Sequence, residues 1–165
     1  MAKNQLVTID KRMALLPKLE VLVFNENRLQ YLPKELQQMP NLHSLYLGKN
    51  DLGGLSESEL NQIFEVLAAI PTLRKLFLQH NAFTKIPSSI TKLTQITHLN
   101  ISRNNLTEFP AILQEMPHLE SIHHSRNFFS LDSIGDNIDI EWLKSVTADD
   151  WLDYRCKTYI QPLPK

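Results

Sequence analysis

The chain of 165 residues contains a single cysteine, Cys156. One cysteine excludes an intramolecular disulfide and a cysteine-rich cap, so we expect a reducing, cytoplasmic location. The N-terminal sequence MAKNQLVTIDKRMALL also has no continuous apolar region of the kind found in signal peptides. The sequons at Asn100 and Asn105 are therefore expected to be coincidental.

Glycine is scarce and the net charge is small, and both absences restrict the possible functions. Only four glycines are present, and the GxxxxGK(S/T), GxGxxG, HExxH and GxSxG motifs are all missing. The formal net charge of −1 gives no general attraction to nucleic acid or anionic membranes. No apolar run approaches the length of about 20 residues that crosses a bilayer. The sequence thus favours a non-catalytic protein without a cofactor, and neither nucleic acid nor a membrane is the expected partner.

What the chain has instead is an internal repeat of leucine and asparagine. Five segments approximate the pattern LxxLxLxxNxL: LEVLVFNENRL (19–29), LHSLYLGKNDL (42–52), LRKLFLQHNAF (73–83), ITHLNISRNNL (96–106) and LESIHHSRNFF (119–129). The repeated asparagines follow one another at intervals of 23, 31, 23 and 23 residues: Asn27, Asn50, Asn81, Asn104 and Asn127. One such unit cannot bury its apolar face alone, so we expect stacked repeats with the leucines inside. The asparagines should turn inward and bond the backbone of the turn, which makes them structural residues.

This pattern resembles the leucine-rich repeat family over roughly residues 4 to 131. The intervening stretches LPKELQQMPNL, IPSSITKLTQI and FPAILQEMPHL are similar to the 23-residue repeat type of intracellular scaffold and bacterial proteins. The resemblance implies an α/β solenoid, an arc with a parallel β-sheet on its concave side and mostly short turns on its convex side. It divides the chain into leucine-rich repeats at 1–131, a partial first repeat plus five, and a helical C-terminal cap at 132–165.

Two departures from the regular spacing carry further information. The 31-residue interval contains a capping box at Ser56 and Glu59, which predicts one true helix on the convex side. The apolar face of this helix consists of Leu60, Ile63, Phe64, Leu67 and Ile70. At the N-terminus, Asn4-Gln-Leu6 lies 23 residues before the equivalent positions of the next repeat and fits a sixth, partial repeat. The chain is then either a fragment of a longer solenoid or a domain with a degenerate N-terminal cap.

Beyond Phe129 the repeat stops, and the remaining segment predicts two short helices. Trp142, Leu143 and Val146 indicate the first. Thr147 with Asp150 indicates the start of the second, one face of which carries Trp151, Leu152, Arg155, Cys156 and Tyr159. Its YRCKTYIQPLP is faintly similar to the cap motif of some intracellular leucine-rich repeat proteins. Terminal repeats need such a cap to shield the open core.

Alternation of side chains across a strand places defined columns of residues on the concave face. The N-terminal half of this face is expected to be apolar and aromatic, and the C-terminal half polar and basic. The candidate partner-binding residues are Val23, Tyr46, Lys75, Phe77, His98, Asn100, Arg103, His123 and Arg126. Two alternatives to partner binding stay open. The first is that Tyr46 and Phe77 merely pack against each other. The edge made of Lys49, His80, Arg103 and Arg126 could be a solvated loop ridge instead of a contact for acidic groups.

The stretch HLESIHHSRNFFS, residues 118–130, raises the question of a metal site. His123 and His124 are consecutive, so they point to opposite faces of a strand. His124 takes an inward leucine position and is expected to be structural, with a hydrogen-bond partner supplied by the C-terminal cap. His98 and His123 share the concave face but lie diagonally, without a third ligand, so no metal is predicted. Asp132, Asp136 and Asp139 lack the EF-hand pattern and indicate a solvated acidic loop rather than a calcium site.

Taken together, these features favour a non-catalytic protein–protein interaction module, a monomer that binds an unidentified protein on its concave sheet. One alternative is the targeting or substrate-recognition part of a larger protein, or a bacterial effector secreted into the host cytosol. The least favoured alternative is a thiol enzyme, because Cys156 is expected to be buried against the repeats. RNA binding is also disfavoured, since four scattered cations on a nearly neutral chain match a phosphate backbone poorly.

Overall fold

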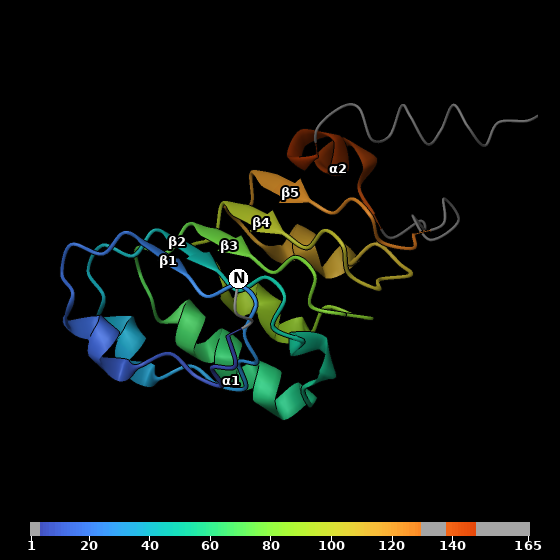
Figure 1. The fold of residues 1–165 in the computed structure, drawn as a ribbon. Helices are drawn as coiled ribbons and strands as arrows, with labels where there is room; N and C mark the ends of the chain where they lie inside the picture. Colours follow the sequence, from blue (N-terminus) through green and yellow to red (C-terminus); the bar gives the residue numbers. More distant parts are fainter. Residues whose placement is uncertain (1–3, 130–137, 148–165) are drawn as a thin grey trace, which may run out of the picture.

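Five short parallel strands form a single sheet whose order follows the chain, β1-β2-β3-β4-β5 (Figure 1). The computed structural model describes residues 4–129 and 138–147. Each strand pairs in register with its neighbours, so equivalent residues of successive repeats stand side by side. The predicted arc with a parallel sheet is confirmed. The strands are β1 (Val21–Val23), β2 (Ser44–Tyr46), β3 (Lys75–Phe77), β4 (His98–Asn100) and β5 (Ser121–His123).

Short 3-10 helices carry the chain back along the other layer of the arc. They are η1 (Lys11–Leu15), η2 (Lys34–Gln38), η3 (Leu52–Gly54), η4 (Ser88–Lys92) and η5 (Ala111–Glu115). Three of them begin directly after a proline: Pro33, Pro87 and Pro110. The proline ring fixes φ near about −65°, which suits an extended residue that leads into a helical turn. These prolines therefore set the point at which three of the repeats turn.

The long repeat carries the one α-helix of this layer, α1 (Glu57–Ala68), which packs between η2 and η4. Its N-terminus is a capping box, in which the Ser56 side chain accepts a hydrogen bond from the Glu59 N–H and the Glu59 carboxylate accepts one from the Ser56 N–H. The predicted apolar face is buried, because Leu60, Ile63, Phe64 and Leu67 all face the sheet side of the helix. The structure confirms the helix that the 31-residue interval predicted.

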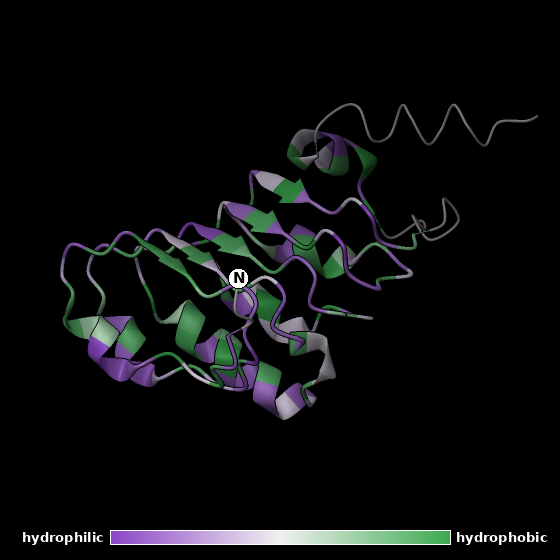
Figure 2. Cartoon of the chain, in the orientation of Figure 1, coloured by the Kyte–Doolittle hydropathy of each residue, from purple (hydrophilic) through white to green (hydrophobic). Residues whose placement is uncertain are grey.

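A continuous hydrophobic core runs between the two layers. Leu45, Leu76 and Leu99, at the centres of three neighbouring strands, are each at most 1% exposed. Figure 2 shows the same division, with hydrophobic residues along the strands and on the helices of the other layer. Burying a leucine side chain stabilises a fold by about 1.5–3 kcal/mol. The stacked leucines therefore supply the main energy that holds successive repeats together.

The repeated asparagines form a second, polar ladder inside the same core. Asn81 is fully buried, and its Oδ1 accepts hydrogen bonds from the N–H of Asn50 at 2.8 Å and of Leu52 at 3.3 Å. Its Nδ2 donates to the carbonyl oxygens of Leu47 at 2.9 Å and Leu78 at 3.0 Å. Each amide thus joins its own repeat to the preceding one and satisfies backbone groups that the core has removed from water. All five are at most 8% exposed: Asn27, Asn50, Asn81, Asn104 and Asn127.

The N-terminal residues continue this ladder. The Leu6 N–H donates to Asn27 Oδ1 at 3.2 Å, as the Leu29 N–H does to Asn50 Oδ1 at 3.2 Å. The Arg28 N–H also donates to the Leu6 carbonyl oxygen at 3.0 Å. These residues therefore occupy the place of a preceding repeat, at the position that the 23-residue spacing indicates.

The predicted first helix after the repeats is present as α2 (Ile140–Val146), which packs beside β5. Leu143 and Val146 are buried, and the Trp142 ring meets the Phe109 ring edge-on at 6.4 Å. Asp139 is exposed, and its side chain accepts hydrogen bonds from the N–H groups of residues 141 and 142. It caps the N-terminus of α2, a role that the expectation of a solvated acidic loop did not include.

Several expectations concern residues outside the described part of the chain. These are the second helix expected to follow Thr147 and its apolar face, the thiol of Cys156, and the carboxylates of Asp132 and Asp136. Thr147 itself is described, and it ends α2, with its hydroxyl donating to the Leu143 carbonyl oxygen at 2.6 Å.

Candidate functional site

The strand register settles which residues share the concave face. Val23, Tyr46, Phe77, Asn100 and His123 follow one another across the five strands, one residue from each. A parallel column two residues earlier contains Val21, Ser44, Lys75, His98 and Ser121. All nine candidate partner-binding residues lie either in these columns or directly before the ladder asparagine.

Tyr46 and Phe77 form the aromatic centre of this face. Their rings stack with centroids 4.0 Å apart and an angle of 3° between the planes. Both side chains remain only partly buried, so the stack presents a flat apolar surface to solvent. The structure thus shows the mutual packing that was one of the two interpretations. This packing also fixes both rings in place, so ordering them on binding would cost little conformational entropy.

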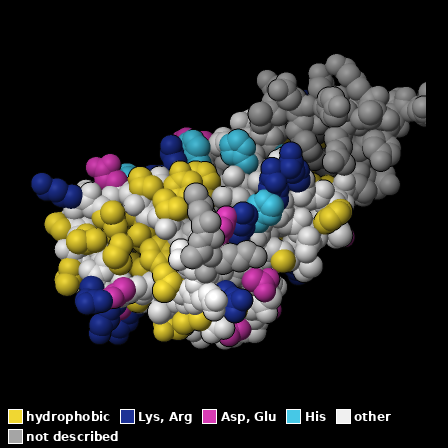
Figure 3. Space-filling view, in the orientation of Figure 1, with side chains coloured by type: hydrophobic (Ala, Val, Ile, Leu, Met, Phe, Trp, Pro, Cys, Tyr) yellow, Lys and Arg dark blue, Asp and Glu magenta, His cyan; other side chains and the backbone are white. Residues whose placement is uncertain are grey.

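The apolar surface extends from this stack to the edge of the sheet. Val21 is 48% and Val23 is 60% exposed, and both belong to β1, the first strand. In Figure 3, yellow hydrophobic side chains cover much of the N-terminal end, while dark-blue and cyan side chains gather toward the later repeats. The expected gradient from apolar to polar and basic therefore exists on the folded surface.

Beside this surface lies a set of contacts that repeat periodicity did not indicate. Asn25 Oδ1 accepts a hydrogen bond from the Gly48 N–H at 2.8 Å. A Cβ added to Gly48 would come within 2.9 Å of the Gln79 side chain, so the absent side chain makes room for that glutamine. A glycine in a column of polar residues was the only signal for this packing in the sequence.

Some side chains in the polar half of the face form hydrogen bonds with neighbouring residues of the chain. Asn100 Oδ1 accepts hydrogen bonds from the Ser102 N–H at 3.0 Å and the Ser102 hydroxyl at 2.7 Å. His98 Nδ1 lies 2.8 Å from the Thr97 hydroxyl. His123 is exposed and stands opposite Asn100, so it is diagonal to His98 as expected. These contacts hold His98 and Asn100 in defined orientations.

Four basic residues form a row beside the ladder asparagines, and we call Lys49, His80, Arg103 and Arg126 the basic ridge. The Lys49 ammonium pairs with the Glu26 carboxylate at 2.7 Å. Arg103 Nη1 lies 3.3 Å from His80 Nε2. Partial desolvation and repulsion from Arg103, Lys49 and Arg126 lower the pKa of His80 below its ordinary value. Within the described residues, neither arginine forms an ion pair.

His124 differs from the other histidines because it belongs to the core. It is 4% exposed, and its ring packs edge-on against Phe109 at 5.6 Å and at a tilt against Phe129 at 5.9 Å. Burial lowers the pKa of His124 to about 4, with a smaller contribution from the charge of His123. The expected inward position is therefore present, and the imidazole is neutral at neutral pH. A hydrogen bond from the C-terminal cap to this ring stays a prediction.

No cluster of three or more metal-ligating side chains occurs among the residues that the structure describes. Within the same residues, no helix is long and apolar enough to cross a bilayer.

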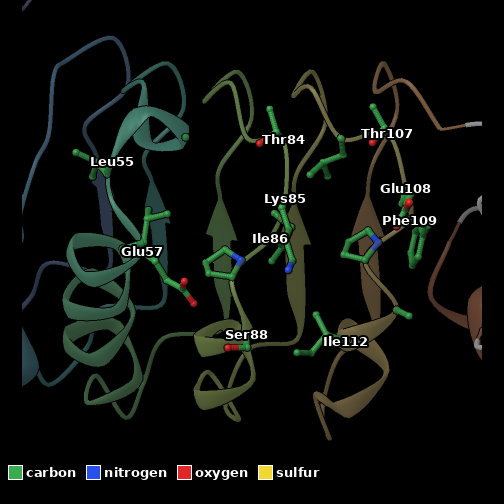
Figure 4. Close-up of a pocket in the computed structure, with 16 residues that line it drawn as sticks. Leu55, Glu57, Thr84, Lys85, Ile86, Ser88, Thr107, Glu108, Phe109 and Ile112 are labelled. Carbon is green, nitrogen blue, oxygen red and sulfur yellow. The ribbon is translucent and has the colours of Figure 1, made fainter.

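A groove on the convex side was missed by the sequence analysis. It has a volume of about 680 Å³ and lies where the long repeat meets two shorter ones. Figure 4 shows Leu55 and Glu57 on one side, Phe109 on the other, and Lys85 and Ile86 between them. The 31-residue interval could have indicated it, because a thicker repeat beside thinner ones leaves a step.

The stacked strands, return segments and asparagine ladder define a repeat solenoid. Comparison of the sequence with protein families gives the more specific assignment, because the leucine rich repeat model matches residues 1–52 and 71–129. The chain belongs to the leucine-rich repeat family. The intracellular and bacterial subtype of its repeats stays a prediction.

Similar proteins are diverse and mostly much longer. The chain is 35% identical over 125 residues to the probable serine/threonine-protein kinase pats1 of Dictyostelium discoideum, a match that covers 71% of this chain and 4% of that protein. It is 33% identical over 136 residues to the transforming growth factor beta activator LRRC33 of Danio rerio, covering 77% and 19%. The chain therefore spans less than a fifth of the length of either relative.

Solved structures show the same fold. A chain of the Toll–Spätzle complex of Drosophila superposes with a TM-score of 0.56 at 25% identity, covering 68% of this chain and 14% of that one. A leucine-rich repeat protein of Leptospira interrogans gives a TM-score of 0.50 at 25% identity, covering 76% and 36%. Leucine-rich repeat domains generally serve as protein-interaction modules, and this function applies to the present chain at that level.

Proposed function

We propose that the chain is a non-catalytic module that binds a protein partner on its concave sheet. The observation that carries the proposal is the Tyr46–Phe77 stack, which is rigid, apolar and partly exposed at the centre of the sheet. Val21 and Val23 extend it to a contiguous apolar surface. Exposed apolar patches on a protein surface mark interaction sites, and tyrosine is enriched at binding hot spots.

In this proposal the polar half of the face orients the partner. His98, Asn100 and His123 lie beside the aromatic stack on the next two strands. Hydrogen bonds from such groups contribute less to affinity than the buried rings, but they penalise partners that leave them unpaired. The apolar half would supply buried area, and the polar half would supply register and specificity.

The proposal is tested by replacing both aromatic residues, Tyr46 and Phe77, with alanine. A hot-spot side chain contributes about 2 kcal/mol or more, so the double variant should bind its partner at least about 100-fold more weakly. The matched control is Tyr31→Ala, because Tyr31 is 51% exposed and lies away from the sheet, near Gln62 and Glu65. Affinity capture from lysate with mass spectrometry would identify proteins that the wild type and Tyr31→Ala retain and the double variant loses. Equal capture by a double variant with an unchanged circular dichroism spectrum would refute the proposal.

A second candidate is that the chain acts as the targeting part of a larger protein. The supporting observation is that pats1 and LRRC33 are both more than five times as long as the segment that they share with this chain. The mass of the native protein distinguishes the two cases, because the chain alone has a mass of 19.1 kDa. A cytoplasmic location, and the alternative of an effector acting in a host cytosol, belong to the same set of proposals.

The absence of catalysis is likewise a proposal. Alkylation of Cys156 tests the competing thiol enzyme, since a structural thiol reacts slowly in the folded protein and quickly after unfolding. Fast alkylation of the native protein, faster than that of the unfolded chain, would contradict a non-catalytic module.

A further inference from the structure

The basic ridge is built from equivalent positions in four successive repeats. Lys49, His80, Arg103 and Arg126 each directly precede a ladder asparagine and have φ of 56°, 59°, 55° and 59°. This left-handed conformation is one that glycine or asparagine adopts with less strain. Because adjacent parallel strands lie about 4.8 Å apart, the four side chains form a regular row.

The positive charge of this row is offset at its N-terminal end. Lys49 is paired with Glu26, and both side chains are about half exposed. In the described part of the chain, no acidic side chain pairs with Arg103 or Arg126. Among the described residues, the ridge therefore presents two guanidinium groups without an ion-pair partner, beside a histidine.

The contact between Arg103 and His80 shows which protonation state the free ridge favours. A guanidinium is always a donor, so at 3.3 Å from Arg103 Nη1 the Nε2 atom of His80 must act as the acceptor. His80 is then neutral, with its proton on Nδ1. The charged groups that act on this ring are Lys49, Arg103 and Arg126, all cations. A negative group placed between His80 and Arg103 would attract the guanidinium and favour the protonated form of His80.

We propose that the basic ridge binds an acidic segment of the protein partner, with one carboxylate held between Arg103 and His80 and a proton taken up by His80 on binding. The inference rests on the proposed function, because it assigns the chemistry of part of the same partner. The carboxylate accepts a hydrogen bond from the guanidinium and a second from Nε2–H once His80 is protonated. On binding, the contact between Arg103 and His80 in the free protein is replaced by two charge-assisted hydrogen bonds to the carboxylate.

Charge complementarity favours an acidic protein segment over RNA. One of the four cations is already paired, and the row contains no phenylalanine, tyrosine or tryptophan ring as a stacking platform for bases. Two arginines and one histidine match a short run of carboxylates better than a continuous phosphate backbone.

The probe is a fluorescein-labelled octapeptide, (Asp-Glu)4, with (Asn-Gln)4 as its uncharged counterpart, measured by fluorescence polarisation in 20 mM salt. We expect (Asp-Glu)4 to bind, to tighten at least about threefold between pH 8 and pH 6, and to weaken about tenfold or more in 0.3 M salt. The pair Arg103→Gln and Arg126→Gln should lose at least about tenfold in affinity. Lys34→Gln removes one positive charge from η2, away from the ridge, and should change affinity by less than about twofold.

The variant His80→Gln tests whether His80 takes up the proton when the peptide binds. This variant should bind (Asp-Glu)4 at pH 8 but lose the tightening toward pH 6. Tightening that survives in His80→Gln would assign it to His98 or His123 and overturn the role of His80. Absence of binding up to 1 mM peptide, equal binding of (Asn-Gln)4, or unchanged binding by the double arginine variant would each overturn the ridge as an acidic-segment site. Tighter binding of a 12-nucleotide poly(U) than of (Asp-Glu)4 would do the same in favour of RNA.

The concave-sheet proposal and the basic-ridge proposal can be refuted independently of each other. The Tyr46/Phe77 double alanine variant should still bind (Asp-Glu)4, because the ridge lies beside the sheet and not on the aromatic stack. If that variant retains the peptide but also retains every captured protein, the concave-sheet proposal fails and the ridge stands. If it loses captured proteins while the double arginine variant binds the peptide normally, the ridge fails and the sheet stands.

Discussion

Replacing His124 with leucine should remove a loss of stability that the wild-type protein suffers as pH falls. The other inward positions of this column are Phe24, Leu47, Leu78 and Ile101, so leucine suits the site. In the folded protein burial lowers the pKa of His124 from 6.5 to about 4. The unfolded chain therefore binds a proton more readily than the folded chain throughout that interval.

The sign and size of the effect follow from this difference. The contribution of neutral His124 is fully present above pH 6.5, declines as pH falls below it, and levels off below about pH 4. The whole difference corresponds to about 3 kcal/mol, of which about 2 kcal/mol is lost between pH 7.5 and pH 5.

Urea unfolding followed by circular dichroism at pH 7.5 and pH 5 measures this loss. The drop in the free energy of unfolding should be about 2 kcal/mol smaller for His124→Leu than for the wild type. His118→Gln, which alters an exposed histidine in the same segment, should keep the wild-type drop. An equal drop in the wild type and in His124→Leu would show that the buried imidazole does not control this pH dependence.

Two further predictions use neighbouring residues as matched pairs. Asn104→Ala should lower the free energy of unfolding by about 2–5 kcal/mol, because the buried Asn104 side chain forms hydrogen bonds with backbone groups of two repeats. Asn105→Ala, at an exposed position, should lower it by less than about 0.5 kcal/mol. Gly53→Ala should lower the free energy of unfolding by at least about 1–3 kcal/mol, because the new Cβ would lie 2.5 Å from the Ala82 carbonyl carbon. Gly54→Ala, with its nearest neighbour at 3.5 Å, should be tolerated. Denaturant unfolding measures both pairs, and equal losses within a pair would contradict the packing described.

The sequence predicted the parts of the fold that depend on period and capping. The LxxLxLxxNxL pattern fixes which side chains point inward, so the strand columns, the buried asparagines and the inward His124 all followed from spacing. Ser56 and Glu59 likewise predicted the start of α1, because a capping box is a local arrangement of four residues.

Contacts between repeats could not be predicted in the same way. The 4.0 Å stacking of Tyr46 on Phe77 was expected only as one of two interpretations, and the 3.3 Å contact of Arg103 with His80 was not expected at all. Both depend on rotamers that neighbouring side chains select. The convex groove depends on a difference in thickness between repeats. The capping role of Asp139 was missed, because three spaced aspartates suggested only a solvated acidic loop, whereas its position just before Ile140 makes it a helix cap.

The asparagine ladder also gives the solenoid a direction. Asn104 Oδ1 accepts from the N–H groups of Asn81 and Phe83, and Asn127 Oδ1 accepts from the Leu106 N–H, so each repeat protects backbone amides of the repeat before it. In amide hydrogen exchange, the protection of a ladder amide should therefore report the integrity of the repeat that follows it. When one repeat opens transiently, the ladder amides that lose their asparagine acceptor belong to its N-terminal neighbour.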